Sequence, residues 1–313
     1  MNVAIIDLGT NTFNLLIATI SNGIYTTQFV TKEFVKLGEG GINIKTIQPL
    51  AFKRGLDTLL DYKLLCEQYN CEKIIGIATS AIRNATNGQE FVKQAKDISN
   101  IDIFTIDGNQ EADFIYKGTI GAIDLKDGVN MIMDVGGGST EFIICDQQKV
   151  YWKKSVEVGV TRLFEGFHKE DPIALDNIQH IKKHLDNLLE EVISQAKKYK
   201  VTTLVGSSGA FTSMANIILC KKNQEDILKT STAYDFSLED FTAIHNLLIQ
   251  TTLKERLEIE GLIKERAPMM VVGSILVDYV LNEVGVQYFR LSRYSLKEGV
   301  AIAVAQNEFE LKK

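Results

Sequence analysis

The sequence has few of the residues that mark several common protein classes. Among 313 residues it has three prolines, one tryptophan, four histidines and four cysteines. The cysteines are scattered, and the one close pair, Cys66 and Cys71, has no second pair or histidine cluster to complete a zinc site. We therefore expect buried or inert thiols, which suits a reducing compartment.

Long apolar runs and an excess of positive charge are also missing. No window reaches about 18 uncharged apolar residues, and no charged N-terminal segment precedes a long apolar stretch. We therefore expect a cytoplasmic protein without a membrane span. The net charge of −6 disfavours non-specific binding to DNA or RNA, so no nucleic-acid partner is expected.

The pattern along the chain is typical of an α/β protein, because strand-like runs alternate with helical periodicity. Its length suits two domains. Leu56, Leu60 and Leu64 indicate one helix, and Asp171-Pro172 indicates the start of another. No linker composition marks the domain boundary, which the spacing of two similar hairpins places near residue 121.

The two hairpins share a layout of apolar strand, aspartate, glycine-containing turn and second apolar strand. This self-similarity indicates a duplicated domain. Turn glycines let backbone N–H groups approach an anion, and the neighbouring hydroxyl groups add donors, so we expect phosphate binding rather than a merely flexible turn. No Walker A motif is present. The expected phosphate-binding residues are Thr10, Asn11, Thr12, Gly136, Gly137, Gly138, Ser139 and Thr140.

Carboxylates flank both turns. Asp7 and Asp134 each end a strand before the turn, and Glu141 follows the second turn. Carboxylates beside a phosphate repel it unless a cation lies between them, and oxygen ligands with phosphate favour Mg²⁺. The alternative is that Asp7 and Asp134 cap their turns through side-chain hydrogen bonds.

Two further charged residues follow predicted strands. Arg83 can bind two phosphate oxygens through its planar guanidinium group, and Glu111 stands near the start of a predicted helix, where it can act as a general base. Residue pattern alone leaves both as surface residues.

Taken together, these motifs resemble those of the exopolyphosphatase and guanosine pentaphosphate phosphohydrolase (Ppx/GppA) family, within the actin-like ATPase superfamily. The resemblance covers nearly the whole chain and fits the short, two-domain form. It implies two actin-like, ribonuclease H-like domains with an interdomain cleft, at 1–121 plus 298–313 and at 122–297. The motifs begin with Asp7-Leu8-Gly9-Thr10-Asn11-Thr12, Leu37-Gly38-Glu39-Gly40 and Ala78-Thr79-Ser80-Ala81-Ile82-Arg83, and continue with Gln110-Glu111-Ala112, Asp134 to Glu141, Gly159 to Leu163, Gly206-Ser207-Ser208-Gly209 and Leu296-Lys297-Glu298-Gly299.

The resemblance also implies roles for single residues. Glu111 stands where the family places its catalytic base, and Arg83 where it places a phosphate-binding arginine. Asp134 and Glu141 match acidic residues tied to magnesium and the attacking water. Gln110 departs from the family's glutamate, and Gly206-Ser207-Ser208-Gly209 departs from its usual glycine-rich stretch, which puts a nucleotide-base contact there in doubt.

The expected activity is that of an exopolyphosphatase, which removes the terminal phosphate of inorganic polyphosphate by magnesium-assisted attack of water. Three alternatives stay open. They are a guanosine pentaphosphate (pppGpp) 5′-phosphohydrolase, a non-catalytic sensor of alarmone or polyphosphate, and an ATP-dependent kinase of the same superfamily. The resemblance also allows a homodimer, because relatives dimerise.

Overall fold

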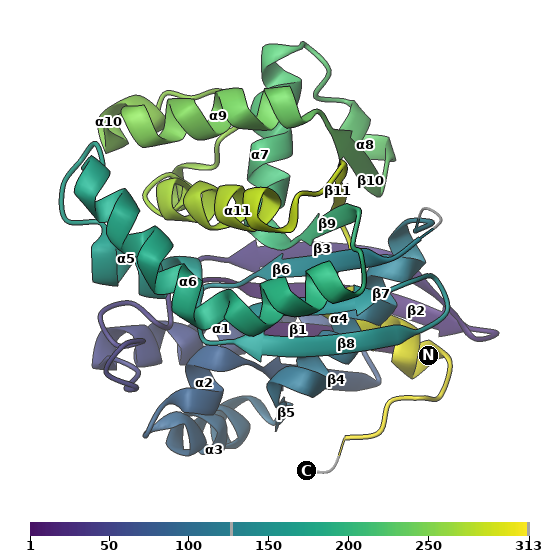
Figure 1. Ribbon diagram of the computed structural model, residues 1–313. Helices are drawn as coiled ribbons and strands as arrows, with labels where there is room; N and C mark the ends of the chain where they lie inside the picture. The colour runs from purple at the N-terminus through teal and green to yellow at the C-terminus, as the bar shows by residue number, and fades with distance from the viewer. Residues whose placement is uncertain (126–127, 312–313) are drawn as a thin grey trace. The chain divides into compact units, whose positions relative to one another are not determined.

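The computed structural model describes residues 1–125 and 128–311 (Figure 1). The chain divides into two compact units. Unit 1 is Met1–Gly121 with Ser295–Lys313, and unit 2 is Ala122–Tyr294. We propose that these units correspond to the two domains expected from the sequence.

Unit 1 is built on a five-stranded sheet in the order β3-β2-β1-β4-β5. Strands β1, β4 and β5 are parallel, and β2 runs antiparallel to both β1 and β3. The central strand β1 carries an apolar run from Val3 to Ile6 that is buried throughout, as its central position requires. The elements are β1 (Asn2–Leu8), β2 (Phe13–Ser21), β3 (Ile24–Glu33), α1 (Pro49–Gln68), β4 (Lys73–Ala78), α2 (Ser80–Asn84), α3 (Gly88–Ser99), β5 (Asp102–Thr105), α4 (Gly108–Ala122) and α12 (Leu296–Ala305).

Unit 2 is built on a six-stranded sheet in the order β10-β11-β9-β6-β7-β8. Strands β6, β9 and β11 are parallel, and β7 runs antiparallel to both β6 and β8. The strands are β6 (Asn130–Val135), β7 (Thr140–Cys145), β8 (Val150–Val156), β9 (Thr203–Ser207), β10 (Ala233–Phe236) and β11 (Tyr288–Ser292). The helices are α5 (Val160–Phe167), α6 (Leu175–Lys198), α7 (Ser208–Lys221), α8 (Ile227–Thr230), α9 (Leu238–Gln250), α10 (Leu253–Arg256), a short 3₁₀ helix (Lys264–Arg266) and α11 (Met270–Val284).

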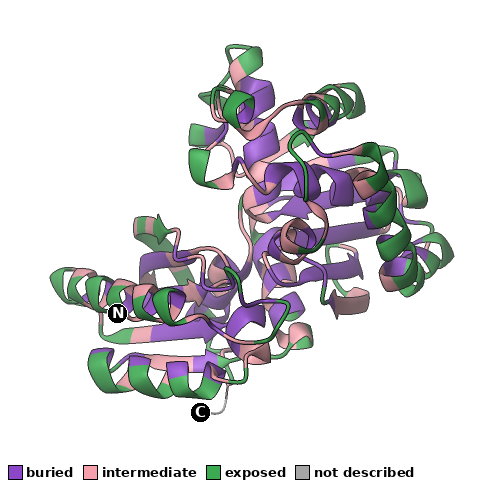
Figure 2. Cartoon of the chain, turned by 90° about the vertical axis from the view of Figure 1, so that its left-hand side faces the viewer, coloured by how far each residue is buried: buried purple, intermediate pink, exposed green. Residues whose placement is uncertain are grey.

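The two sheets repeat one topology. Read from β8, the unit 2 order β8-β7-β6-β9-β11 has the same directions as β3-β2-β1-β4-β5, and β10 is added at the far edge. This confirms the expected α/β class, with two mixed sheets that share one topology. In each unit the central strands are buried (Figure 2), whereas the edge strand β3 of unit 1 is largely exposed.

One helix prediction is confirmed, and the start of another needs correction. Leu60 and Leu64 do lie on a helix, α1, but they are 39% and 57% exposed, and its buried face carries Leu59 and Tyr62 instead. The helix expected from Asp171-Pro172 begins only at Leu175. Asp171 does not cap it, because its carboxylate accepts hydrogen bonds from Arg256 and from the backbone of α10.

The described residues include all four cysteines. All four thiols are free, and Cys66 and Cys145 are buried. Burial raises the pKa of the Cys66 thiol to about 12, which makes it a poor nucleophile at neutral pH. Among residues 1–125 and 128–311, no helix is long and apolar enough to cross a membrane.

A close contact between α4 and α12 fixes the helix that carries Glu111. A Cβ atom at Gly299 would lie 1.8 Å from the carbonyl oxygen of Phe114, and one at Gly118 would lie 2.1 Å from that of Ser295. Both clashes are with backbone, which cannot swing aside. Gly299, in the motif near the C-terminus, therefore allows the backbone of α12 to pack directly against that of α4.

Replacing Gly299 with alanine should lower the free energy of unfolding by about 1–3 kcal/mol, because the new methyl group overpacks this contact. Gly166 is the matched control. It also lies in a helix, a methyl group added to it would meet nothing within 4 Å, and the protein should gain up to about 1 kcal/mol from alanine there. Urea denaturation of the two variants checks the pair. Equal effects would show that the α4–α12 contact tolerates a side chain.

Candidate active site

The turn of unit 1 joins β1 to β2. Gly9 donates its N–H to the carbonyl oxygen of Thr12 at 3.2 Å, and a Cβ at Gly9 would lie 2.9 Å from that oxygen. Before the turn, one carboxylate oxygen of Asp7 accepts a hydrogen bond from the side-chain amide of Asn14 at 2.9 Å. This hydrogen bond pairs two residues that lie opposite each other in the hairpin.

The turn of unit 2 joins β6 to β7 and has the same geometry. Gly136 donates its N–H to the carbonyl oxygen of Ser139 at 3.0 Å, and a Cβ at Gly136 would again lie 2.9 Å from that oxygen. The hydroxyl group of Thr140 donates to the carbonyl of Val158, so the structure directs it to the backbone. The two hairpins thus repeat in three dimensions the layout seen in the sequence.

In unit 2 the turn carbonyls are held from behind. Those of Gly136 and Gly137 accept hydrogen bonds from the backbone at the start of α5, and that of Gly138 accepts one from Nε of Arg162 at 2.7 Å. In the described part of the chain, the N–H groups of Gly137, Gly138 and Ser139 donate to no protein acceptor. Successive N–H groups of this kind form an anion-binding nest.

The unit 1 turn is held in the same way. The carbonyls of Thr10 and Asn11 accept hydrogen bonds from the N–H groups of Gly38 and Lys36, at 3.0 and 2.9 Å. The motif Leu37-Gly38-Glu39-Gly40 therefore braces this turn. A Cβ at Gly38 would lie 2.5 Å from the methyl group of Thr10, which explains the glycine there.

Two carboxylates lie side by side in the unit 2 sheet. Asp134 on β6 pairs with Glu141 on β7, and residues directly opposite each other on neighbouring strands point to the same face. On the outer sides, Ser207 donates its hydroxyl to Asp134, and Ser155 donates to Glu141 at 2.7 Å. The register thus sets the four residues in one row, Ser207–Asp134–Glu141–Ser155.

In unit 1, the structure brings Arg83 and Glu111 together. They follow β4 and β5, neighbouring parallel strands whose carboxyl ends share an edge with the Gly9 turn. Nη1 of Arg83 lies 2.9 Å from a carboxylate oxygen of Glu111 and donates to the carbonyl of Ile106 at 3.0 Å. Both side chains are largely buried, at 16% and 9% exposed. Arg83, expected as a phosphate ligand, therefore also holds Glu111.

The start of α4 explains the Gln110 that departs from the family pattern. Asp107 accepts hydrogen bonds from the N–H groups of Asn109 and Gln110, and the side chain of Gln110 accepts one from the N–H of Asp107. This is a reciprocal capping box, in which glutamine or glutamate serves equally. Gln110 thereby fixes the helical turn from which Glu111 projects.

The start of α7 has no open space above its glycine. A Cβ at Gly209 would lie 2.3 Å from the guanidinium group of Arg266, which donates to the carbonyl of Gly209 at 2.7 Å and to Ser213 at 3.1 Å. Desolvation lowers the pKa of Arg266 to about 10, so the group stays cationic at neutral pH. The side chain of Arg266 therefore lies directly against the Gly206-Ser207-Ser208-Gly209 motif.

Comparison with known proteins identifies the family of the chain. The model of the Ppx/GppA phosphatase family matches residues 16–308. The chain belongs to this family. Three relatives are similar to it, one known by its structure and two by sequence.

The relative of known structure is an exopolyphosphatase from Cytophaga hutchinsonii. It is 36% identical to this chain, with a TM-score of 0.95 and 98% of each chain covered. Exopolyphosphatase 2 of Mycobacterium tuberculosis is 26% identical over 97% of this chain and 98% of its own. A guanosine-5′-triphosphate,3′-diphosphate pyrophosphatase of Photobacterium profundum is 28% identical, and the match covers 95% of this chain but 58% of that protein.

The structure adds three residues to the sequence-predicted set. Ser155 and Ser207 hold the two carboxylates, and Arg162 holds the glycine turn. Arg162 stands in the motif Gly159 to Leu163, which already singled it out. Ser155 carried no sequence signal, because only the β7–β8 register brings it beside Glu141.

Proposed function

We propose that this member of the Ppx/GppA phosphatase family is an exopolyphosphatase that releases the terminal phosphate of inorganic polyphosphate. The observation that carries this proposal is in unit 2. There, the turn whose three successive N–H groups form the nest directly follows one carboxylate of a cross-strand pair and precedes the other. A phosphate-binding nest and a pair of hard oxygen ligands stand next to each other in a few residues.

The carboxylate pair fits magnesium. Two like charges directly opposite each other in a sheet destabilise it unless a cation or a proton offsets them. Mg²⁺ is commonly bound by one or two carboxylates together with waters and substrate phosphates. Asp134 and Glu141 would hold the ion, and Ser207 and Ser155 orient them. When bound, the ion offsets charge on the phosphate oxygens. Asp7, held by Asn14, is the third proposed metal-associated residue.

The chain's own residues then divide the remaining work. The N–H groups of residues 137–139 and the turn of residues 10–12 bind phosphate oxygens. Glu111 accepts a proton from the attacking water, whose oxygen forms a bond to the terminal phosphorus as the bridging P–O bond breaks. The shortened polyphosphate leaves with the bridging oxygen. Arg83 orients Glu111 and lies where it can meet phosphate.

Polyphosphate is favoured over guanosine pentaphosphate by one feature of unit 2. At the start of α7, the Arg266 side chain lies against Gly209 and donates a hydrogen bond to its carbonyl, in the motif that departs from the family's usual glycine-rich stretch. The relatives from Cytophaga hutchinsonii and Mycobacterium tuberculosis are named exopolyphosphatases, in keeping with this choice.

Phosphate release with magnesium tests the proposal directly. Polyphosphates of several lengths and guanosine pentaphosphate are compared at equal concentrations of cleavable ends. We expect release from polyphosphate at the higher kcat/KM. Release from the nucleotide alone would assign the protein to alarmone hydrolysis. Binding without release from either substrate would support the sensor, and turnover of ATP that requires an acceptor would support the kinase.

Arg162 provides a second test, because it supports the turn without being a proposed ligand. In Arg162→Lys the hydrogen bond from Nε to Gly138 is lost, while a cation near Glu157 is kept. A charge-assisted hydrogen bond is worth about 1.5–3 kcal/mol, so we expect KM for polyphosphate to rise about tenfold or more. Glu157→Gln, which leaves the Nε bond intact, is the control and should keep the wild-type KM. An unchanged KM in Arg162→Lys would show that the turn needs no such support.

A further inference from the structure

A loop of unit 1 brings extra positive charge to the edge where Arg83 and the Gly9 turn lie. Strand β3 runs parallel to β1, because both are antiparallel to β2, so the segment 34–48 that follows β3 leaves the sheet at the carboxyl end of β1. The N–H of Lys36 binds the carbonyl of Asn11 at 2.9 Å, and the carbonyl of Lys45 accepts from Thr86, just beyond α2, at 2.8 Å. The loop thus connects the phosphate turn to α2.

The two lysines of this loop contribute charge that no acidic neighbour offsets. Neither Lys36 nor Lys45 forms an ion pair within residues 1–125 and 128–311. The only acidic residue of the loop, Glu39, is taken by Arg54 at 2.9 Å. The loop and its partner Arg54 together therefore carry a formal charge of +2, in a protein whose net charge is −6.

The backbone at these positions does not itself call for lysine. Lys36 and Lys45 have φ values of +50° and +55°, a left-handed conformation that asparagine and glycine adopt more readily. Lys200 of unit 2 has φ +54° and is exposed, as Lys45 is, so the conformation alone marks no site. What separates the loop lysines from Lys200 is their place, since Lys200 lies before the amino end of β9, at the opposite edge from the Gly136 turn.

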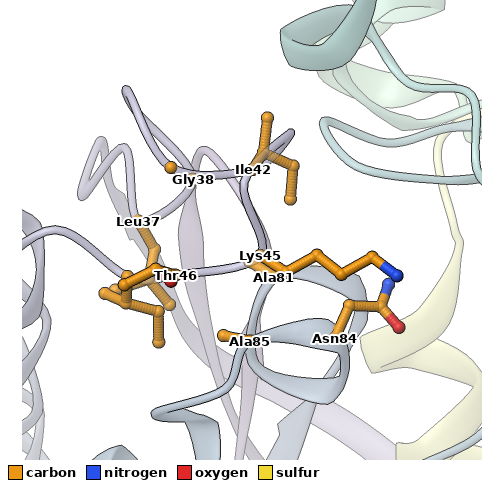
Figure 3. Close-up of a pocket in the computed structure, with 10 residues that line it drawn as sticks. Leu37, Gly38, Ile42, Lys45, Thr46, Ala81, Asn84 and Ala85 are labelled. Carbon is orange, nitrogen blue, oxygen red and sulfur yellow. The ribbon is translucent and has the colours of Figure 1, made fainter.

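The side chain of Lys45 is directed toward α2. Figure 3 shows it extended along the helix, with its ammonium group beside the side-chain amide of Asn84, the neighbour of Arg83 in sequence. The hollow beneath, lined largely by apolar side chains such as Leu37 and Ile42, has a volume of about 10 Å³ and holds about one water molecule. The hollow is too small for a phosphoryl group, so a phosphorylated ligand would contact the Lys45 ammonium group on the protein surface without entering the hollow.

We propose that Lys36 and Lys45, with the Asn84 amide, form a subsite for the internal phosphoryl groups of polyphosphate, those that follow the terminal group to be cleaved. This inference rests on the proposed function. Each internal phosphoryl group carries one negative charge on two oxygens, which suits an ammonium group acting as a point charge. The subsite makes no bond and moves no proton, so it acts on substrate binding and leaves the chemical step unchanged.

The experiment replaces each lysine with asparagine, which accepts the left-handed backbone and removes the charge together with most of the aliphatic chain. KM and kcat are measured for Lys36→Asn, Lys45→Asn and the matched control Lys200→Asn, on long-chain polyphosphate and on guanosine pentaphosphate. We expect KM for polyphosphate to rise about three- to tenfold in each loop variant, with kcat unchanged and the control like wild type. The difference should shrink as salt is raised, because exposed charges are screened.

The outcomes separate the sources of the ligand. A rise in KM for polyphosphate that exceeds the rise for the nucleotide supports a subsite for the polymer, whereas equal rises support a subsite for any phosphoryl chain. An unchanged KM in both loop variants, or an equal rise in Lys200→Asn, overturns the inference. If the wild type hydrolyses neither compound, the proposed function fails by itself, and titration with polyphosphate decides the subsite. Weaker polyphosphate binding by the loop variants than by the wild type then supports the subsite, and equal binding contradicts it.

Discussion

Replacing Glu111 with glutamine should reduce kcat for phosphate release from polyphosphate by about 10²- to 10⁴-fold, the usual contribution of a general base. KM should change little, because glutamine still accepts the hydrogen bond from Arg83 that positions the side chain. The pH profile gives a second measurement. The loss of activity toward acid pH that reports protonation of a base should be absent from the residual activity of the variant.

The neighbouring Gln110 supplies the control. In Gln110→Glu the capping box at the start of α4 is kept, since either residue can accept the N–H of Asp107, so kcat should match the wild type. Circular dichroism and thermal melting show whether Glu111→Gln remains folded despite the loss of a buried ion pair. A folded Glu111→Gln variant with wild-type kcat would remove Glu111 from the chemistry and leave it as the partner of Arg83.

Both hairpin turns could be predicted from the sequence because their determinants are local. In each hairpin the strand, the aspartate and the small-residue turn are consecutive in the sequence. The same backbone hydrogen bond closes both turns, from Gly9 to Thr12 and from Gly136 to Ser139. Periodicity likewise indicated helix α1. It did not indicate which face of the helix is buried. Leu59 and Tyr62 are buried and Leu60 and Leu64 are exposed, because tertiary packing determines which face contacts the core.

The support of the site could not be predicted, because it depends on register between distant strands. Ser207 lies 73 residues from Asp134 and reaches it only through the parallel β6–β9 pairing. Likewise the ion pair of Arg83 with Glu111 spans 28 residues and follows from the adjacency of β4 and β5. The sequence offered Asp134, Arg83 and Glu111 as candidates, and the strand order decides which residues meet.

The start of α6 is a case in which a local sequence pattern gave a wrong prediction. Asp171 before Pro172 has the local chemistry of a helix cap, yet Arg256, which is 1% exposed, binds its carboxylate at 2.7 Å. Leaving a buried guanidinium group without a counter-charge costs several kcal/mol, whereas a cap contributes about 1 kcal/mol. Asp171 therefore pairs with the distant Arg256 instead of capping the helix, and the sequence near Asp171 gives no sign of this partner.

Replacing Asp134 with asparagine should have opposite effects on activity and on stability. The magnesium concentration for half-maximal activity should rise at least about tenfold, since one of the proposed metal-binding carboxylates is lost. Without magnesium, the variant should be as stable as the wild type or more so. Asparagine removes the repulsion with Glu141, worth up to about 1 kcal/mol across a strand pair, and its carbonyl still accepts from Ser207.

Thermal melting with and without magnesium measures both effects. Magnesium at about ten times its dissociation constant stabilises the native protein by about 1.4 kcal/mol, which corresponds to about 3–6 °C for a unit of this size. The wild type should show this shift and Asp134→Asn should not. Glu191→Gln, which removes an exposed carboxylate that pairs with Lys154 in the same unit, should keep it. A full magnesium shift in Asp134→Asn would place the ion elsewhere and leave the Asp134–Glu141 pair to be explained by a shared proton, because two adjacent carboxylates cannot both stay ionised at no cost.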